Sequence, residues 1–66
     1  MENKPQLLDT KNAARFLGLS YKTLESWRYA DNVELPYVRL GGKIFYEVKD
    51  LLGFVEKHKV HSLVAQ

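Results

Sequence analysis

The sequence predicts a small α+β domain in which two short helices joined by a tight turn precede a β-hairpin and a third helix. Gly18 separates two stretches with helical periodicity. Gly41 and Gly42 lie together between two runs rich in β-forming residues. The final apolar stretch opens with Asp50, an acid suited to a helix N-terminus. This order of elements is that of a small winged helix-turn-helix.

Length and composition indicate one soluble domain. The chain has 66 residues, near the lower limit for a self-sufficient core, and it has no cysteine. Ten Lys and Arg against eight Asp and Glu give a net charge of +2, which leans toward a polyanionic partner. No apolar run approaches the roughly 18 residues of a membrane span, and no signal-peptide pattern opens the chain. We therefore expect a cytoplasmic protein with one domain over residues 1–66, a core at about 7–59, and a flexible lead-in and tail.

The first helix is expected over residues 11–17. Asp9 or Thr10 can cap its N-terminus, and Leu7 or Leu8 can pack on its first turn as a hydrophobic staple. A pair of adjacent alanines indicates close approach of the next helix. The inward stripe is expected to consist of Ala13, Ala14, Phe16 and Leu17.

The second helix is expected after a turn of about three residues. Gly18 supplies the positive φ that ends the first helix, and Leu19 is expected to be an apolar plug. Ser20 is placed to accept a hydrogen bond from a free backbone N–H at the new helix start. Leu24 and Trp27 share the inward face because they are three residues apart. The opposite face is polar and partly basic, with Lys22, Glu25, Ser26 and Tyr29.

A β-hairpin is expected over residues 37–48, because Pro36 prevents a helix from continuing and the paired glycines suit a type I′ or II′ turn.

The closing helix is expected to start near residues 48–50. We interpret Gly53 inside it as a close packing contact, since glycine there costs about 1 kcal/mol relative to alanine. Residues 60–66 either extend this helix or fray. The apolar positions of the helix are Leu51, Leu52, Phe54 and Val55. Those of the tail are Val60, Leu63 and Val64, which can meet a partner chain.

Several motifs follow one another in a specific order: Ala13-Ala14, Leu17-Gly18, Ser20, Thr23, Leu24, Trp27, Pro36, Val38-Arg39-Leu40-Gly41 and Asp50-Leu51. On these motifs the run from Leu8 to Val55 resembles the excisionase/AlpA-type winged-helix family, which is related to the MerR DNA-binding domains. Two features depart from the family pattern. Glu25 places an acid on the face that would meet DNA, and the loop over residues 30–35 is slightly long.

The resemblance implies that the second helix and the hairpin, or wing, contact DNA. Helix N-termini and hydroxyl groups commonly contact phosphates, and lysine can donate to guanine acceptors. Basic side chains on a wing can reach the minor groove or the phosphates that border it. The expected DNA-binding residues are Ser20, Tyr21, Lys22, Thr23, Ser26, Arg28, Arg39 and Lys43.

Each of these assignments has a plain structural alternative. The helix face can simply be solvated, with Ser20 acting only as a cap. Arg28 either contacts a phosphate or forms an exposed salt bridge, and Glu25 either accepts from a cytosine amine or faces solvent. The basic residues of the hairpin can serve only to keep its exposed edge from pairing with another strand. For Trp27 we expect a place in the core rather than stacking on a base.

Nothing in the sequence indicates catalysis or a bound cofactor. No nucleophile has a base partner, and no glycine-rich loop suits a phosphate. His58 and His61 lack a third metal ligand. We therefore expect no enzymatic activity, no cofactor and no small-molecule substrate, and we expect double-stranded DNA as the partner.

Two roles are compatible with the resemblance. An excisionase, or recombination directionality factor, binds tandem sites cooperatively and bends DNA for an integrase or recombinase, which would involve self-association along DNA. An AlpA-like transcriptional regulator is the alternative. The excisionase is favoured because little beyond a DNA-reading domain and a short tail is present. A phage terminase small subunit would need more chain. A winged-helix protein-interaction module is the candidate from a different class, but it would not need basic residues on both the second helix and the wing.

Overall fold

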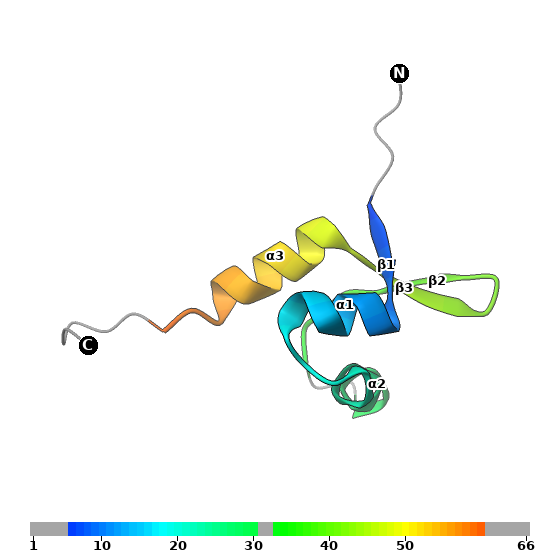
Figure 1. Cartoon of the computed structure of the whole chain (residues 1–66), viewed down its shortest axis with the longest axis horizontal. Coiled ribbons are helices and arrows are strands. Elements are labelled where there is room, and N and C mark those ends of the chain that lie inside the picture. The colour runs from blue at the N-terminus through cyan, green and yellow to red at the C-terminus, as the bar shows by residue number, and fades with distance from the viewer. Residues whose placement is uncertain (1–5, 31–32, 61–66) are drawn as a thin grey trace, which may run out of the picture.

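A computed structural model of the chain describes residues 6–30 and 33–60. The elements in order are β1 (Leu7–Asp9), α1 (Thr10–Leu17), α2 (Tyr21–Ala30), β2 (Val38–Leu40), β3 (Lys43–Glu47) and α3 (Val48–Lys57). The strands form an antiparallel sheet in the order β1-β3-β2. The β2–β3 hairpin projects away from the three helices (Figure 1). The predicted α+β winged helix-turn-helix is confirmed.

Two groups of predictions lie outside the described residues: the flexible lead-in at residues 1–5 and the tail at residues 61–66. α3 ends at Lys57, so the last described residues do not extend the helix. Within the described ranges, no helix is long and apolar enough to cross a membrane.

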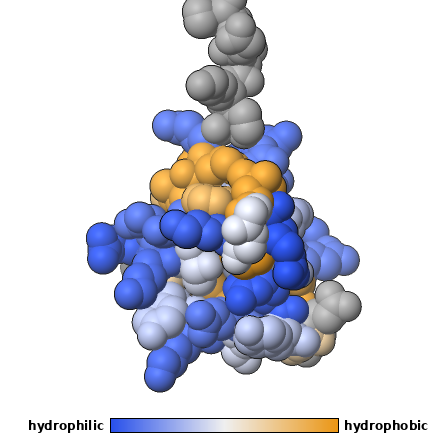
Figure 2. All heavy atoms as spheres, turned by 90° about the vertical axis from the view of Figure 1, so that its right-hand side faces the viewer, coloured by the Kyte–Doolittle hydropathy of each residue, from blue (hydrophilic) through white to orange (hydrophobic). Residues whose placement is uncertain are grey.

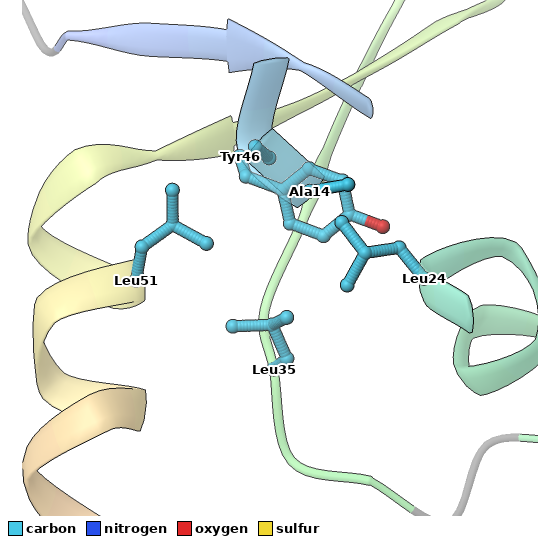
Figure 3. Packing of buried hydrophobic residues seen from close by; sticks show 6 residues of the cluster. Ala14, Leu24, Leu35, Tyr46 and Leu51 are labelled. Atoms are coloured by element: carbon cyan, nitrogen blue, oxygen red, sulfur yellow. The ribbon is translucent and has the colours of Figure 1, made fainter. Parts of the chain in front are cut away.

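A small apolar core fixes the helices against the sheet. Figure 3 shows Leu24, Leu35 and Leu51 converging beneath the ring of Tyr46. These side chains come from α2, the connector over residues 33–37, α3 and β3, so residues far apart in the sequence meet at one point. Every buried side chain among the described residues is apolar or aromatic: Ala13, Ala14, Leu24, Leu35, Tyr46 and Leu51. The core therefore sets where α2 and the hairpin lie relative to each other.

The strand β1 is a feature that sequence reasoning missed. Its three residues pair with β3, with Leu8 opposite Tyr46, and the Val48 N–H donates to the Gln6 carbonyl at 3.0 Å. Three residues are too few to show the alternation that marks a strand, and the pairing partner lies far along the chain. Asp9 ends the strand and caps α1, as predicted for this residue, because its Oδ1 accepts the Asn12 N–H at 2.9 Å.

Two apolar residues were placed wrongly by the sequence analysis. Phe16, expected on the inward stripe, is 44% exposed, and Leu19, expected to be a plug, is 40% exposed. The buried pair Ala13 and Ala14, with the half-buried Leu17, defines the inward face of α1. At about 100° per residue, Phe16 lies outside that narrow stripe. The close approach of α1 and α2 that the alanines indicated is confirmed.

The expectation of a close packing contact at Gly53 is also wrong. A methyl group added to this residue would meet no atom within 4 Å. The backbone of Gly53 is helical, so alanine can adopt it without strain. The glycine therefore costs α3 some stability without permitting a close approach to the described residues.

This geometry gives a stability prediction. We expect Gly53→Ala to raise the free energy of unfolding by about 0.5–1 kcal/mol, since alanine loses less backbone entropy on folding. Urea unfolding followed by circular dichroism measures the change. Gly42→Ala is the control, because Gly42 has φ 83° and a methyl group there is strained, so this variant should be destabilised. A loss of stability in Gly53→Ala would contradict the open environment described for this residue.

Candidate nucleic-acid interface

The turn before α2 is held by hydrogen bonds at both ends. Gly18 has φ 74°, and its N–H donates to the Arg15 carbonyl at 3.1 Å, while the Leu19 N–H donates to the Ala14 carbonyl at 2.8 Å. These two bonds are a Schellman motif, in which glycine allows the left-handed conformation. Ser20 then starts α2 as predicted: its Oγ accepts the Lys22 N–H at 3.1 Å. The angle between α1 and α2 is therefore set locally.

The outward face of α2 is polar and open to solvent. Leu24 is 1% exposed on the inward side, and the half-buried Trp27 packs beside it against the core, as expected. Thr23 is half-buried at one edge of the outward face, and Glu25 is half-buried between Tyr21 and Tyr29, four residues from each. The exposed side chains around them form an open strip that consists of Tyr21, Lys22, Ser26 and Tyr29. This strip can donate and accept hydrogen bonds along the whole length of α2.

Arg28 is less available than an exposed arginine would be. Its guanidinium lies 5.2 Å from the centre of the Tyr29 ring and 5.9 Å from that of Tyr37, within cation–π distance of both. Nη1 is buried, and within residues 6–30 and 33–60 it has no hydrogen-bond partner. Partial burial acts to lower the pKa of Arg28, but the nearby Tyr46 and Tyr29 hydroxyls outweigh it, and the net pKa is raised. The cation thus links α2 to the connector before the hairpin.

The wing is a two-residue hairpin with an open tip. Gly41 and Gly42 have φ 54° and 83°, which is a type I′ turn, as the paired glycines predicted. Arg39 lies opposite Ile44, and Leu40 lies opposite Lys43. Partners across a pair point to the same face and neighbours along a strand to opposite faces. The two exposed basic residues of the wing therefore extend from opposite faces of the hairpin.

The end of the molecule that carries the wing is polar on its flanks. Figure 2 faces this end and shows hydrophilic side chains on both sides, with an apolar area between them toward the N-terminal end.

Two basic residues of α1 join the candidate interface, and sequence reasoning missed both. Lys11 and Arg15 are exposed and four residues apart, so they share one face of α1. The Lys11 ammonium lies 5.4 Å from the centre of the Tyr21 ring. Together with Leu19 and Ser20 these residues line a shallow depression beside the N-terminus of α2. The i,i+4 spacing was the available signal, but only the turn geometry shows that the pair lies next to α2.

The comparisons with known proteins agree with this geometry. The model of a family described as a helix-turn-helix domain matches residues 7–59, a range that runs from β1 to just beyond α3. No curated protein sequence matches the chain significantly.

Proposed function

The chain belongs to this family of DNA-binding helix-turn-helix domains, and on that premise we propose that it is a sequence-specific DNA-binding protein of phage or mobile-element type that acts as an excisionase. In this role it binds tandem sites cooperatively and bends the duplex, so that an integrase or recombinase can assemble on it. The finer assignment is supported by the order of motifs that resembles the excisionase/AlpA-type proteins.

One observation best supports sequence-specific DNA binding: two separate elements present exposed basic side chains from a single core. α2 carries Lys22 and Ser26 on its open strip, and the wing carries Arg39 and Lys43. A recognition helix lies in the major groove, where lysine and serine can bond base edges. Wing side chains then reach the neighbouring minor groove or its phosphates. A protein-interaction module would need no such pairing of basic elements.

The remaining residues are proposed to position the domain. Tyr21, Thr23 and the capped start at Ser20 lie at the N-terminal end of α2, where hydroxyls and backbone N–H groups suit phosphates. Lys11 and Arg15 extend this phosphate-binding surface onto α1. We propose that Arg28 acts mainly by holding α2 against Tyr37, and so fixes the distance between helix and wing.

Curvature separates the excisionase from an AlpA-like regulator. One short helix and one short wing cover only a few base pairs, so useful occupancy requires several copies side by side. Bending a site of 20–30 base pairs by 40–90° costs on the order of 1–6 kcal/mol, which contacts between neighbouring copies can offset. A regulator at a single operator has no need of this curvature.

We therefore expect cooperative binding with bending on a duplex selected from random sequence. Gel shifts should show several complexes that form over a narrow concentration range, and circular permutation should show a bend. The chain truncated after Lys59 is expected to lose the cooperativity but to keep binding single sites. A single unbent complex that the truncation leaves unchanged would favour the regulator. No binding at any salt concentration would favour the protein-interaction module.

A further inference from the structure

A groove lies beside α2 on the side away from the open strip. Leu24 and Tyr46 form part of its lining, and α2, the connector and α3 surround it. Lys22 and Ser26 project from the opposite side of α2, since Leu24 and Trp27 turn inward. The groove therefore stays open when the strip on α2 faces DNA. Its other lining residues are Trp27, Arg28, Val33, Glu34, Leu35, Pro36, Tyr37, Lys49, Asp50, Gly53, Phe54 and Lys57.

The groove is suited to apolar side chains. The rings of Trp27 and Phe54 lie 5.5 Å apart in it. Arg28 also lines the groove. At the rim, Lys57 Nζ and Glu34 Oε1 pair at 2.9 Å, so these two charges are already matched. An uncharged apolar peptide segment suits a groove with two packed aromatic rings and a rim whose charges are paired.

The same chain contains such a segment. Val60 is 91% exposed, and Leu63 and Val64 follow it at spacings of three and four residues. No acidic residue lies between Val60 and Gln66. Figure 1 shows the last described residues leaving the end of α3 and running away from the other helices. This direction takes Val60 away from the core of its own chain.

We propose that the groove of one copy receives the apolar segment 60–64 of a second copy. The proposal rests on the excisionase role, for which it supplies the contact between adjacent copies. Groove and segment are different surfaces, so each copy uses one of each, and the contact is heterologous. A heterologous contact that does not close extends into a row, which is the arrangement that tandem sites on a duplex require.

Gly53 offers a way to fill the groove without disturbing the fold. It lies in the groove wall, and a Cβ atom added there meets no atom within 4 Å. In Gly53→Leu the new side chain should occupy the groove, whereas Gly53→Ala should leave it open. Both variants replace glycine in a helix with a better helix former, so both should fold, and thermal unfolding checks this.

Sedimentation equilibrium of the full chain without DNA tests the contact directly. The wild type and Gly53→Ala should show an average mass that rises with concentration. Gly53→Leu and the double variant Leu63→Ser/Val64→Ser should associate at least about tenfold more weakly, because one or two apolar side chains lose their burial. A mixture of these two defective proteins should recover a species of two chains, since one has an intact segment and the other an intact groove.

Equal association of all variants would overturn the proposal, as would a monomeric wild type or a mixture that recovers nothing. A monomeric wild type is the result expected if the segment filled the groove of its own chain. Gel shifts on a single-site duplex keep the two proposals apart. All variants should bind that duplex alike, and a protein that associates but binds no DNA would overturn the proposed function while leaving the groove contact intact.

Discussion

Leu24→Ala is expected to leave the domain largely unfolded at 25 °C. Leu24 is 1% exposed and meets Leu35, Leu51 and Tyr46 at the centre of the core (Figure 3). Truncating a buried leucine to alanine costs about 2–5 kcal/mol through lost burial and the cavity that remains. A domain of this size has a total stability of about 3–10 kcal/mol, so the loss is comparable to the whole. Thermal and urea unfolding followed by circular dichroism measure it.

Leu52→Ala is the matched control for this prediction. Leu52 lies in α3 and is 53% exposed, so the same substitution should change the free energy of unfolding by about 0.5 kcal/mol or less. If Leu24→Ala melted as Leu52→Ala does, the side of α2 that carries Leu24 would not be the inward one. The assignment of the open strip on the other side of α2 would then fail with it.

The parts of the fold that could be predicted are those with local chemical causes. Gly18 ends α1 because glycine, which has no Cβ, adopts the left-handed conformation without steric strain. Ser20 caps α2 through a hydrogen bond to Lys22, two residues away. The turn at Gly41 and Gly42 has the same local character. β1 could not be predicted, because its stability comes from pairing with β3 across the domain. Phe16 was wrongly expected on the inward stripe for a related reason. The apolar pattern of α1 does not show how wide its buried face is.

In the candidate site too, features with local causes could be predicted and contacts between elements could not. The outward direction of Lys22 and Ser26 follows from helix periodicity once Leu24 is inward, and the structure places both on the open strip. Contacts between elements were out of reach of the sequence. The stacking of Arg28 near Tyr37 depends on where the connector runs, and the position of Lys11 over the Tyr21 ring depends on the angle between α1 and α2. The opposite faces of Arg39 and Lys43 required the hairpin register.

Lys22→Ala is expected to reduce the preference for the cognate duplex. A lost base contact costs about 1–3 kcal/mol, or roughly 5- to 150-fold in affinity, and binding to unrelated duplexes should change much less. The fold should survive, because the Lys22 side chain is exposed. The hydrogen bond that caps α2 is donated by the backbone N–H of Lys22 to Ser20 Oγ, and alanine keeps this N–H. Fluorescence anisotropy on the selected duplex and on a scrambled duplex measures the two affinities.

Lys43→Ala gives the contrast that makes the result interpretable. Lys43 is exposed on the wing, where a phosphate contact would weaken both duplexes to a similar degree. A domain this small should make about four to six phosphate contacts, so the wild-type log–log salt slope should be about −4 to −5. Losing one contact should make that slope less negative by about 1 in Lys43→Ala.

If Lys22→Ala left both affinity and preference intact, α2 would not be the recognition helix. If Lys43→Ala changed only the preference, the wing would read sequence, and positioning would fall to Lys11 and Arg15 on α1.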